Sequence, residues 1–294
     1  MTRRTRPDGP HRFPSMTMNT GPSPTPPLLV VGCPRSGTSL FAKLLDAAGL
    51  TTVADERASD KYPSGYFEHV PLLMFHKAME RFPREATHHR ADFVPTTDPF
   101  LEAAHLQQPF VESLFAEAFA PILSGKVDFL KFPQLALSLD ALFETLGDVR
   151  VVAVWRDPTR AVLSLARKEF GRDVFPFRGL RSVLLWTTYA YHICRAKERH
   201  PDRVAVALVD RVVDGSTPVD RVLKPLGYDI TAVPVSDVVD PHVWTKESSL
   251  ADRLRVHALD RLVSASARPL GVDPVLTGID AWTRRLLAVT PATL

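Results

Sequence analysis

The loop at residues 32–37 places a basic side chain, Arg35, between two glycines and is followed directly by Thr38. The apolar run 28–31 before the loop predicts a strand that is buried on both faces. Apolar residues at helical spacing follow the loop and predict a helix that begins near Thr38 and ends at Gly49. The first-turn N–H groups of such a helix lack intrahelical partners, and the helix dipole also attracts negative charge. We therefore expect an anion to bind at this loop.

The loop differs from the loop that binds nucleoside triphosphates in many enzymes. That loop has a lysine directly after its second glycine, and here the position is occupied by Thr38. The cation instead lies inside the loop, at Arg35. The loop can hold an oxyanion, but it lacks the lysine that bridges the β- and γ-phosphates.

A second group of polar residues follows the apolar run 150–155, which predicts another buried strand. Arg156 ends this strand, Asp157 and Pro158 are typical of a helix start, and Ser164 lies two turns into that helix. Parallel sheets bind ligands beyond the carboxyl ends of their strands, and a guanidinium with a hydroxyl suits a phosphate. We interpret Arg156 and Ser164 as a phosphate contact. The alternative is that Arg156 pairs with a carboxylate while Ser164 faces solvent.

The composition is that of an ordinary globular protein. The chain has 294 residues, of which 45% are hydrophobic and 23% are charged, which suits one large α/β domain or two small ones. The net charge of +3 does not suggest nucleic-acid binding. Two cysteines are too few for a disulfide framework or a cysteine-rich metal site. No apolar run reaches the about 18 residues of a membrane span, and the basic N-terminus lacks the apolar region of a secretory signal, so we expect a cytoplasmic protein.

Strands and helices alternate along the chain, which predicts a largely parallel sheet with right-handed crossovers. Residues 1–27 are rich in proline and arginine and predict a disordered extension, so we expect a single domain at 28–294. The segment at about 70–125 is mainly helical and rich in aromatic residues, which indicates a helical insertion or lid. Further strands are expected at 127–131 and 203–209, and further helices at 135–146, 158–170, 180–199, 218–226, 250–267 and 279–289.

Taken together, the two polar patches resemble those of the sulfotransferases that use 3′-phosphoadenosine 5′-phosphosulfate (PAPS). The resemblance extends from residue 28 to about residue 209, and its two motifs are specific as a pair. It implies an α/β three-layer sandwich with a mostly parallel central sheet, the P-loop-like sulfotransferase fold, with a helical substrate-binding insertion. In that family the first loop holds the 5′-phosphosulfate, and the arginine and serine of the second motif hold the 3′-phosphate. The matching cofactor-binding residues are Arg35, Ser36, Gly37, Thr38, Ser39, Arg156 and Ser164.

The resemblance also implies a reaction, the transfer of a sulfuryl group from PAPS to a hydroxyl or amine of a small-molecule or carbohydrate acceptor. The product of the donor is adenosine 3′,5′-bisphosphate, and the chemistry requires no metal. Arg35 would stabilise the charge of the transferred group, whereas Lys131 either neutralises the sulfonate or simply caps a strand. The first candidate for the general base is Glu68, within an element that looks like one found in bacterial members, followed by Glu56 and then His69. The aromatic residues of the insertion suggest a partly apolar acceptor pocket, and the alternative for most of these rings is that they form the core of the insertion.

The sequence departs from the cytosolic branch of that family at two points. The glycine-rich cofactor element near the C-terminus is absent, with only Lys246 and Arg253 as weak substitutes, and no histidine follows the pattern of that branch's base. The chain therefore looks nearer the branches with a carboxylate base. Two other functions remain open: a P-loop-like kinase of a small metabolite, which would need a lysine at the loop and carboxylates for Mg²⁺, and a non-catalytic nucleotide-binding protein.

Overall fold

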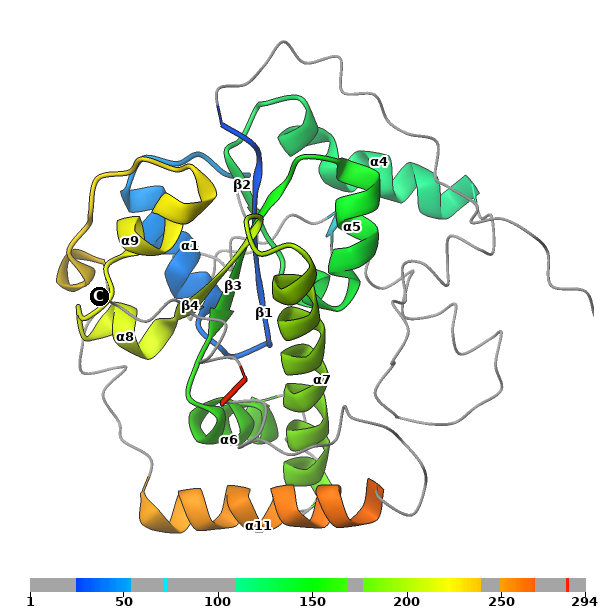
Figure 1. Ribbon diagram of the computed structural model, residues 1–294, viewed down its shortest axis with the longest axis vertical. Coiled ribbons are helices and arrows are strands. Elements are labelled where there is room, and N and C mark those ends of the chain that lie inside the picture. The colour runs from blue at the N-terminus through cyan, green and yellow to red at the C-terminus, as the bar shows by residue number, and fades with distance from the viewer. Residues whose placement is uncertain are drawn as a thin grey trace, which may run out of the picture.

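The computed structural model describes residues 25–53, 71–72, 109–168, 177–238, 249–267 and 284–285 (Figure 1). Within them, four strands form one sheet in the order β2-β1-β3-β4, and every pair of neighbours is parallel. The strands are β1 (Leu28–Gly32), β2 (Phe129–Lys131), β3 (Arg150–Trp155) and β4 (Val204–Leu208). The α-helices are α1 (Thr38–Ala47), α4 (Pro109–Leu123), α5 (Leu139–Leu146), α6 (Pro158–Lys168), α7 (Phe177–Arg199), α8 (Val209–Val213), α9 (Val219–Leu223) and α11 (Leu250–Ala267). Short 3-10 helices are η1 (Pro133–Ser138), η2 (Lys224–Leu226) and η3 (Val235–Asp237).

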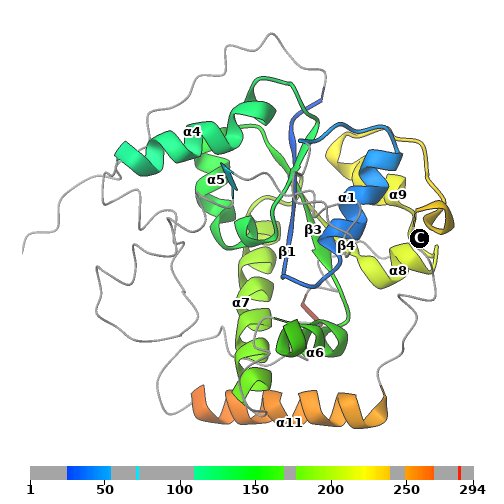
Figure 2. The ribbon, with the colours of Figure 1, turned by 180° about the vertical axis from the view of Figure 1, so that it is seen from behind.

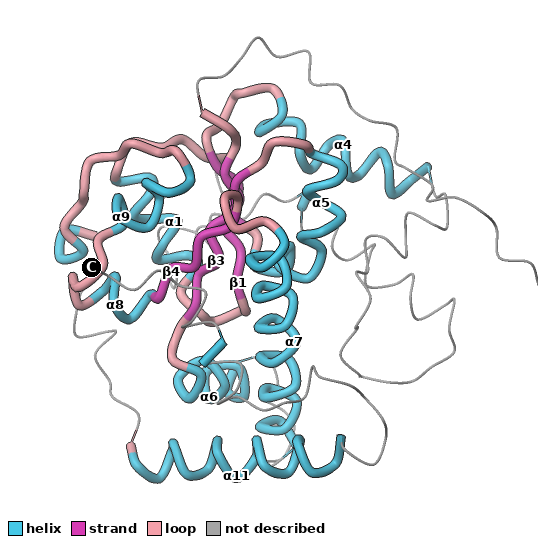
Figure 3. Tube along the Cα trace, viewed as in Figure 1, coloured by secondary structure: helices cyan, strands magenta, loops and turns pink. Residues whose placement is uncertain are grey.

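Both faces of the sheet are covered, because successive side chains of a strand point to opposite faces. In β1, Leu29 and Val31 belong to a core shared with α4, α5, α6, α7 and α11. Leu28 and Val30 belong to a second core on the other face, shared with α1, α8 and α9. The helices thus form layers on either side of the strands, as the ribbon shows from both directions and the tube shows by element type (Figures 1, 2 and 3). The predicted three-layer α/β fold with a parallel central sheet is confirmed.

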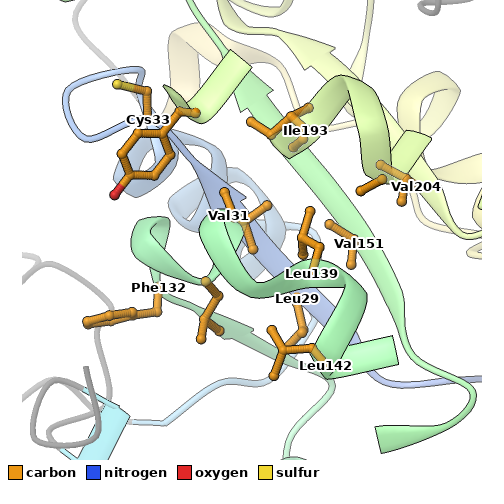
Figure 4. Packing of buried hydrophobic residues seen from close by; sticks show 14 of the residues in the cluster. Leu29, Val31, Cys33, Phe132, Leu139, Leu142, Val151, Ile193 and Val204 are labelled. Atoms are coloured by element: carbon orange, nitrogen blue, oxygen red, sulfur yellow. The ribbon is translucent and has the colours of Figure 1, made fainter. Parts of the chain in front are cut away.

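The larger core joins the strands to the helices that connect them. Figure 4 shows side chains from three strands meeting side chains from the covering helices, with Leu29, Val31, Val151 and Val204 from the sheet and Leu139, Leu142 and Ile193 from α5 and α7. Burying one such side chain contributes roughly 1.5–3 kcal/mol. This packing fixes where each strand ends, and the strand ends carry the polar residues described below.

The strand order changes direction between β1 and β3. From β1 the chain runs through α1 toward β2 at one side of the sheet, whereas β3 is followed by α6, α7 and then β4 at the other side. The helix after β1 packs on one face of the sheet, and the helices after β3 pack on the other (Figures 1 and 2). In open α/β sheets ligands bind beyond the carboxyl ends of the strands at such a point.

The start of α6 follows the predicted capping chemistry. The carboxylate of Asp157 accepts a hydrogen bond from the backbone N–H of Arg160 at 3.0 Å, and Pro158 takes the first helical position. By contrast, the helix expected at 135–146 is split. The chain begins a 3-10 turn at Pro133 as soon as β2 ends, and it becomes α-helical only at Leu139.

The segment of the expected insertion is described only in part. Pro71, Leu72 and α4 are helical, and Leu72 lies in the larger core with Phe115 and Phe119. The two phenylalanine rings pack with their centroids 4.6 Å apart. The rest of the insertion at about 70–125 and the N-terminal residues 1–24 lie outside the described residues, so the insertion, the extension and the domain boundaries stay predictions. Among the helices that are described, none has the length and hydropathy needed to cross a bilayer.

Candidate functional site

The polar residues of the two motifs gather at one edge of the sheet. The loop after β1, Lys131 at the end of β2 and Arg156 after β3 all lie at the carboxyl ends of strands that run in the same direction. Asp210, which belongs to neither motif, follows β4 at the same edge. At the centre, Gly32 of β1 lies opposite Val154 of β3. The site is therefore built where the sheet changes winding direction.

The first loop is held tightly against β3. A Cβ atom added to Gly32 would lie 2.4 Å from the carbonyl oxygen of Val154, so only glycine fits at this position. The hydroxyl of Ser36 is buried and lies 2.6 Å from the carbonyl oxygen of Cys33 and 2.9 Å from that of Val154. The contact with Val154 ties the loop to the sheet. Because the hydroxyl has a single proton, which these carbonyl oxygens accept, the predicted contact of Ser36 with a cofactor stays a prediction.

The loop has the left-handed backbone turns that lead into helix α1. Arg35 has φ of 71°, a region that a residue with a Cβ adopts at a cost of about 1–2 kcal/mol, and Gly37 has φ of 94° directly before α1. A strained residue of this kind persists only where the surrounding structure holds it, and such residues cluster at functional sites. The strained residue lies three positions before α1, whose first turn favours an anion.

The structure brings the two predicted motifs into contact. The Nε atom of Arg35 donates a hydrogen bond to the hydroxyl oxygen of Ser164 in α6 at 3.2 Å, although 129 residues separate the two in sequence. Ser164 therefore faces the loop after β1. The loop proposed to bind one end of a nucleotide and the helix proposed to bind the other lie side by side.

Arg156 lies among charged groups of both signs. Burial lowers the pKa of its guanidinium, while the carboxylate of Asp210 opposes that effect. Arg160 and Arg35 are close enough to lower the pKa further, and Asp157 raises it. Of these five groups three are cations and two are anions, so positive charge is in excess by one. A bound anion would relieve the repulsion between the guanidinium groups.

Asp210 was not singled out from the sequence. Its Oδ1 atom accepts a hydrogen bond from Nη1 of Arg160 at 3.0 Å and lies 4.0 Å from Nε of Arg156. Its Oδ2 atom accepts a hydrogen bond from the backbone N–H of Asp157 at 2.8 Å. A carboxylate two residues beyond the apolar run 204–208 was the available signal, but its importance depends on β4 lying beside β3.

Lys131 is almost completely buried, with 1% of its surface exposed, and its Nζ atom donates a hydrogen bond to the hydroxyl of Ser39 at 3.2 Å. Ser39 lies in the first turn of α1, so a lysine and the positive end of a helix dipole share one position. A buried cation at that end of a helix is stabilised by a negative charge. The arrangement fits an anion bound between the loop and Lys131.

Several predicted residues lie outside the described part of the chain. They include all three candidates for the general base, so these roles stay predictions: Glu56, Glu68 and His69. Lys246 is likewise outside, whereas Arg253 lies on the exposed surface of α11. Within the described ranges, no group of three or more histidine, cysteine, aspartate or glutamate side chains is arranged to hold a metal ion.

Comparison with known proteins gives a family match over most of the site. A model described as "Sulfotransferase family" matches residues 26–228, a range that includes all four strands, the loop, Lys131, Arg156 and Asp210. A search of curated proteins found no match.

Among solved structures, several similar chains are named as sulfotransferases or sulfotransferase domains. The sulfotransferase domain from the Synechococcus PCC 7002 olefin synthase is 15% identical, with a TM-score of 0.42, over 82% of this chain and 96% of that one. Sulfotransferase STF9 from Mycobacterium avium is 16% identical, with a TM-score of 0.44, over 85% of this chain and 78% of that one. Sulfotransferase STF1 from Mycobacterium tuberculosis H37Rv is 15% identical, with a TM-score of 0.42, over 81% of this chain and 76% of that one. The family model spans residues 26–228, which is more than half of the chain.

Proposed function

Because this chain belongs to the sulfotransferase family, we propose that it transfers a sulfuryl group from PAPS to a hydroxyl or amine of a small-molecule or carbohydrate acceptor. The single observation that carries the choice of donor is the hydrogen bond of 3.2 Å between Arg35 and Ser164. It joins the loop suited to a phosphosulfate to the helix suited to a second phosphate. A donor with anionic groups at both ends fits two cationic positions that lie this close together.

The residues present suit such a donor. One position combines Arg35, the first turn of α1 and Lys131, whose Nζ atom is 3.2 Å from Ser39. The other combines Arg156 with Ser164 at the carboxyl end of β3 and in α6. When bound, PAPS supplies the sulfuryl group and a phosphate leaving group, and neither needs a metal ion.

The proposed roles follow from where charge develops during the transfer. Arg35 and Lys131 would stabilise negative charge on the sulfonate and leaving-group oxygens. Fixed hydrogen-bond donors stabilise such charge more strongly in a site shielded from water than they do in water. Binding both anionic ends of the donor would hold its sulfur in line with the acceptor. The acceptor proton would go to a carboxylate, with Glu68 proposed first, Glu56 second and the imidazole of His69 third.

Calorimetry tests the donor class directly. We expect the protein to bind adenosine 3′,5′-bisphosphate without Mg²⁺ with a dissociation constant in the micromolar range, and to bind ATP with Mg²⁺ more weakly. The reason is that Thr38 occupies the position where a kinase loop carries its phosphate-binding lysine. A preference for ATP with Mg²⁺ would overturn the proposal and favour the metabolite kinase.

Arg156→Ala tests the contact with the 3′-phosphate. We expect the affinity for adenosine 3′,5′-bisphosphate to fall roughly tenfold to a hundredfold, the loss of one or two charge-assisted hydrogen bonds, and the affinity for adenosine 5′-phosphate to change little. Arg150→Ala is the matched control, because Arg150 is an arginine at the opposite end of the same strand, β3. Equal losses for the two nucleotides in Arg156→Ala would reject a role specific to the 3′-phosphate.

A further inference from the structure

We propose that Asp210 is a positioning residue that holds Arg156, the arginine proposed for the 3′-phosphate, and the adjacent Arg160 in place from the neighbouring strand. The inference rests on the proposed function, because it assumes that Arg156 binds the 3′-phosphate of the donor. It assigns a role to a residue that belongs to neither of the two motifs.

The contacts of Asp210 reach three parts of the β3–α6 connection. One carboxylate oxygen accepts from Nη1 of Arg160 at 3.0 Å and faces Nε of Arg156 at 4.0 Å. The other accepts from the backbone N–H of Asp157 at 2.8 Å. A single side chain therefore restrains two guanidinium groups and the turn from which both of them project.

The backbone around Asp210 is itself well anchored. β3 and β4 are paired up to Trp155 and Leu208, and Asp210 follows two residues later in the first turn of α8. Val209 and Val212 on either side of it are fully buried. The carboxylate is thus carried by packed structure, whereas a long arginine side chain has many rotamers, which it must give up to bind a phosphate.

The partners are shielded enough for the contacts to matter. The exposed fractions of the side chains are 17% for Arg156, 22% for Arg160 and 32% for Asp210. Ion pairs that are largely exposed contribute little, but paired charges with restricted access to water depend strongly on each other's position.

A positioning role and a charge-balancing role predict opposite effects of removing Asp210 on ligand affinity. If Asp210 only balanced charge, its removal would leave the site more positive and would strengthen the binding of any anion. If it positions the arginines, its removal would weaken the binding of the ligand that needs them, and a carboxylate moved by one methylene would restore that binding only in part. The two roles are therefore separable by experiment.

The test is calorimetry on the full chain with adenosine 3′,5′-bisphosphate and adenosine 5′-phosphate, for the wild type and for Asp210→Asn, Asp210→Glu and Asp210→Ala. We expect Asp210→Ala to lose roughly tenfold in affinity for the bisphosphate, with smaller losses for the Asn and Glu variants and little change for the 5′-phosphate. Asp202→Asn is the matched control, because the substitution removes the same charge from an exposed residue just before the amino end of β4.

The outcomes distinguish this inference from the proposed function. If the wild type does not prefer the bisphosphate, the proposed function fails and the role of Asp210 fails with it. If the wild type binds the bisphosphate more tightly than the 5′-phosphate, and Asp210→Ala or Asp210→Glu keeps the same ratio of affinities, only the positioning role is overturned. A loss of affinity shared equally by both nucleotides would also overturn it. Asp210→Asn has nearly the same shape as the wild type, and its melting temperature without ligand shows whether the fold is retained.

Discussion

Replacing Gly32 with alanine is expected to abolish binding of adenosine 3′,5′-bisphosphate and to lower the free energy of unfolding by about 3 kcal/mol. The added Cβ would lie 2.4 Å from the carbonyl oxygen of Val154, 3.0 Å from Oγ of Ser36 and 3.1 Å from Cγ2 of Thr38. The first of these is a backbone atom of the adjacent strand, so no rotamer change can relieve the clash. Because the same carbonyl accepts the hydrogen bond from Ser36, moving it would release the loop from the sheet. Urea unfolding and calorimetry measure the two effects.

Gly125→Ala separates this clash from the ordinary cost of a left-handed backbone. Gly125 has φ of 68°, and a Cβ built there meets no atom within 4 Å. This variant should lose only the roughly 1–2 kcal/mol of an alanine in the left-handed region and should keep its affinity for the nucleotide. If Gly32→Ala were as stable as Gly125→Ala and still bound the bisphosphate, the loop would not need the close approach to β3.

The main strands could be predicted because the sequence of a strand that is buried on both faces is a continuous apolar run. The runs at 28–31 and 150–155 became β1 and β3 with boundaries that differ by at most one residue, and the expected strand 203–209 became β4. Helix α11 also has the predicted bounds, 250–267. For the strands the signal is local, since burial of neighbouring residues sets both the pattern and the structure.

The arrangement of the site depends on strand order, which no local pattern encodes. That β4 lies beside β3 is what brings Asp210 to Arg156, and Asp210 was therefore missed. The burial of the Ser36 hydroxyl against Val154 was missed for the same reason. The contact between Arg35 and Ser164, by contrast, follows once the motifs are assigned to strands whose carboxyl ends meet at one edge.

Residue type identified the cations of the site but not their environment. The sequence left Lys131 either to neutralise the sulfonate or to cap a strand. In the structure its ammonium group is buried against the first turn of α1, an environment that supports the first of these roles as a proposal. A lysine at the end of a short strand has no pattern that predicts burial, because its burial depends on contact with α1, an element far away in the sequence.

Arg35→Ala is expected to reduce turnover roughly a hundredfold to a thousandfold, comparable to the loss of one donor that stabilises developing negative charge. The guanidinium is held in the loop by a strained backbone and by its hydrogen bond to Ser164, so it is preorganised before the donor binds. Because its charge acts most strongly on the transition state, kcat should fall more than KM for PAPS rises. Turnover is measured as adenosine 3′,5′-bisphosphate released from PAPS in the presence of a mixture of hydroxyl and amine acceptors.

Arg35→Lys refines this expectation, because lysine keeps the charge but loses the planar fork that matches sulfonate and phosphate oxygens. It should retain an intermediate rate, about tenfold below that of the wild type, if geometry as well as charge contributes. Arg221→Ala, which removes an exposed arginine of α9 in the layer on the other face of the sheet from α6, should leave turnover unchanged. Turnover of Arg35→Ala within threefold of the wild type would show that Arg35 only anchors the loop to Ser164, and the role of stabilising the sulfonate would then pass to Lys131 and the first turn of α1.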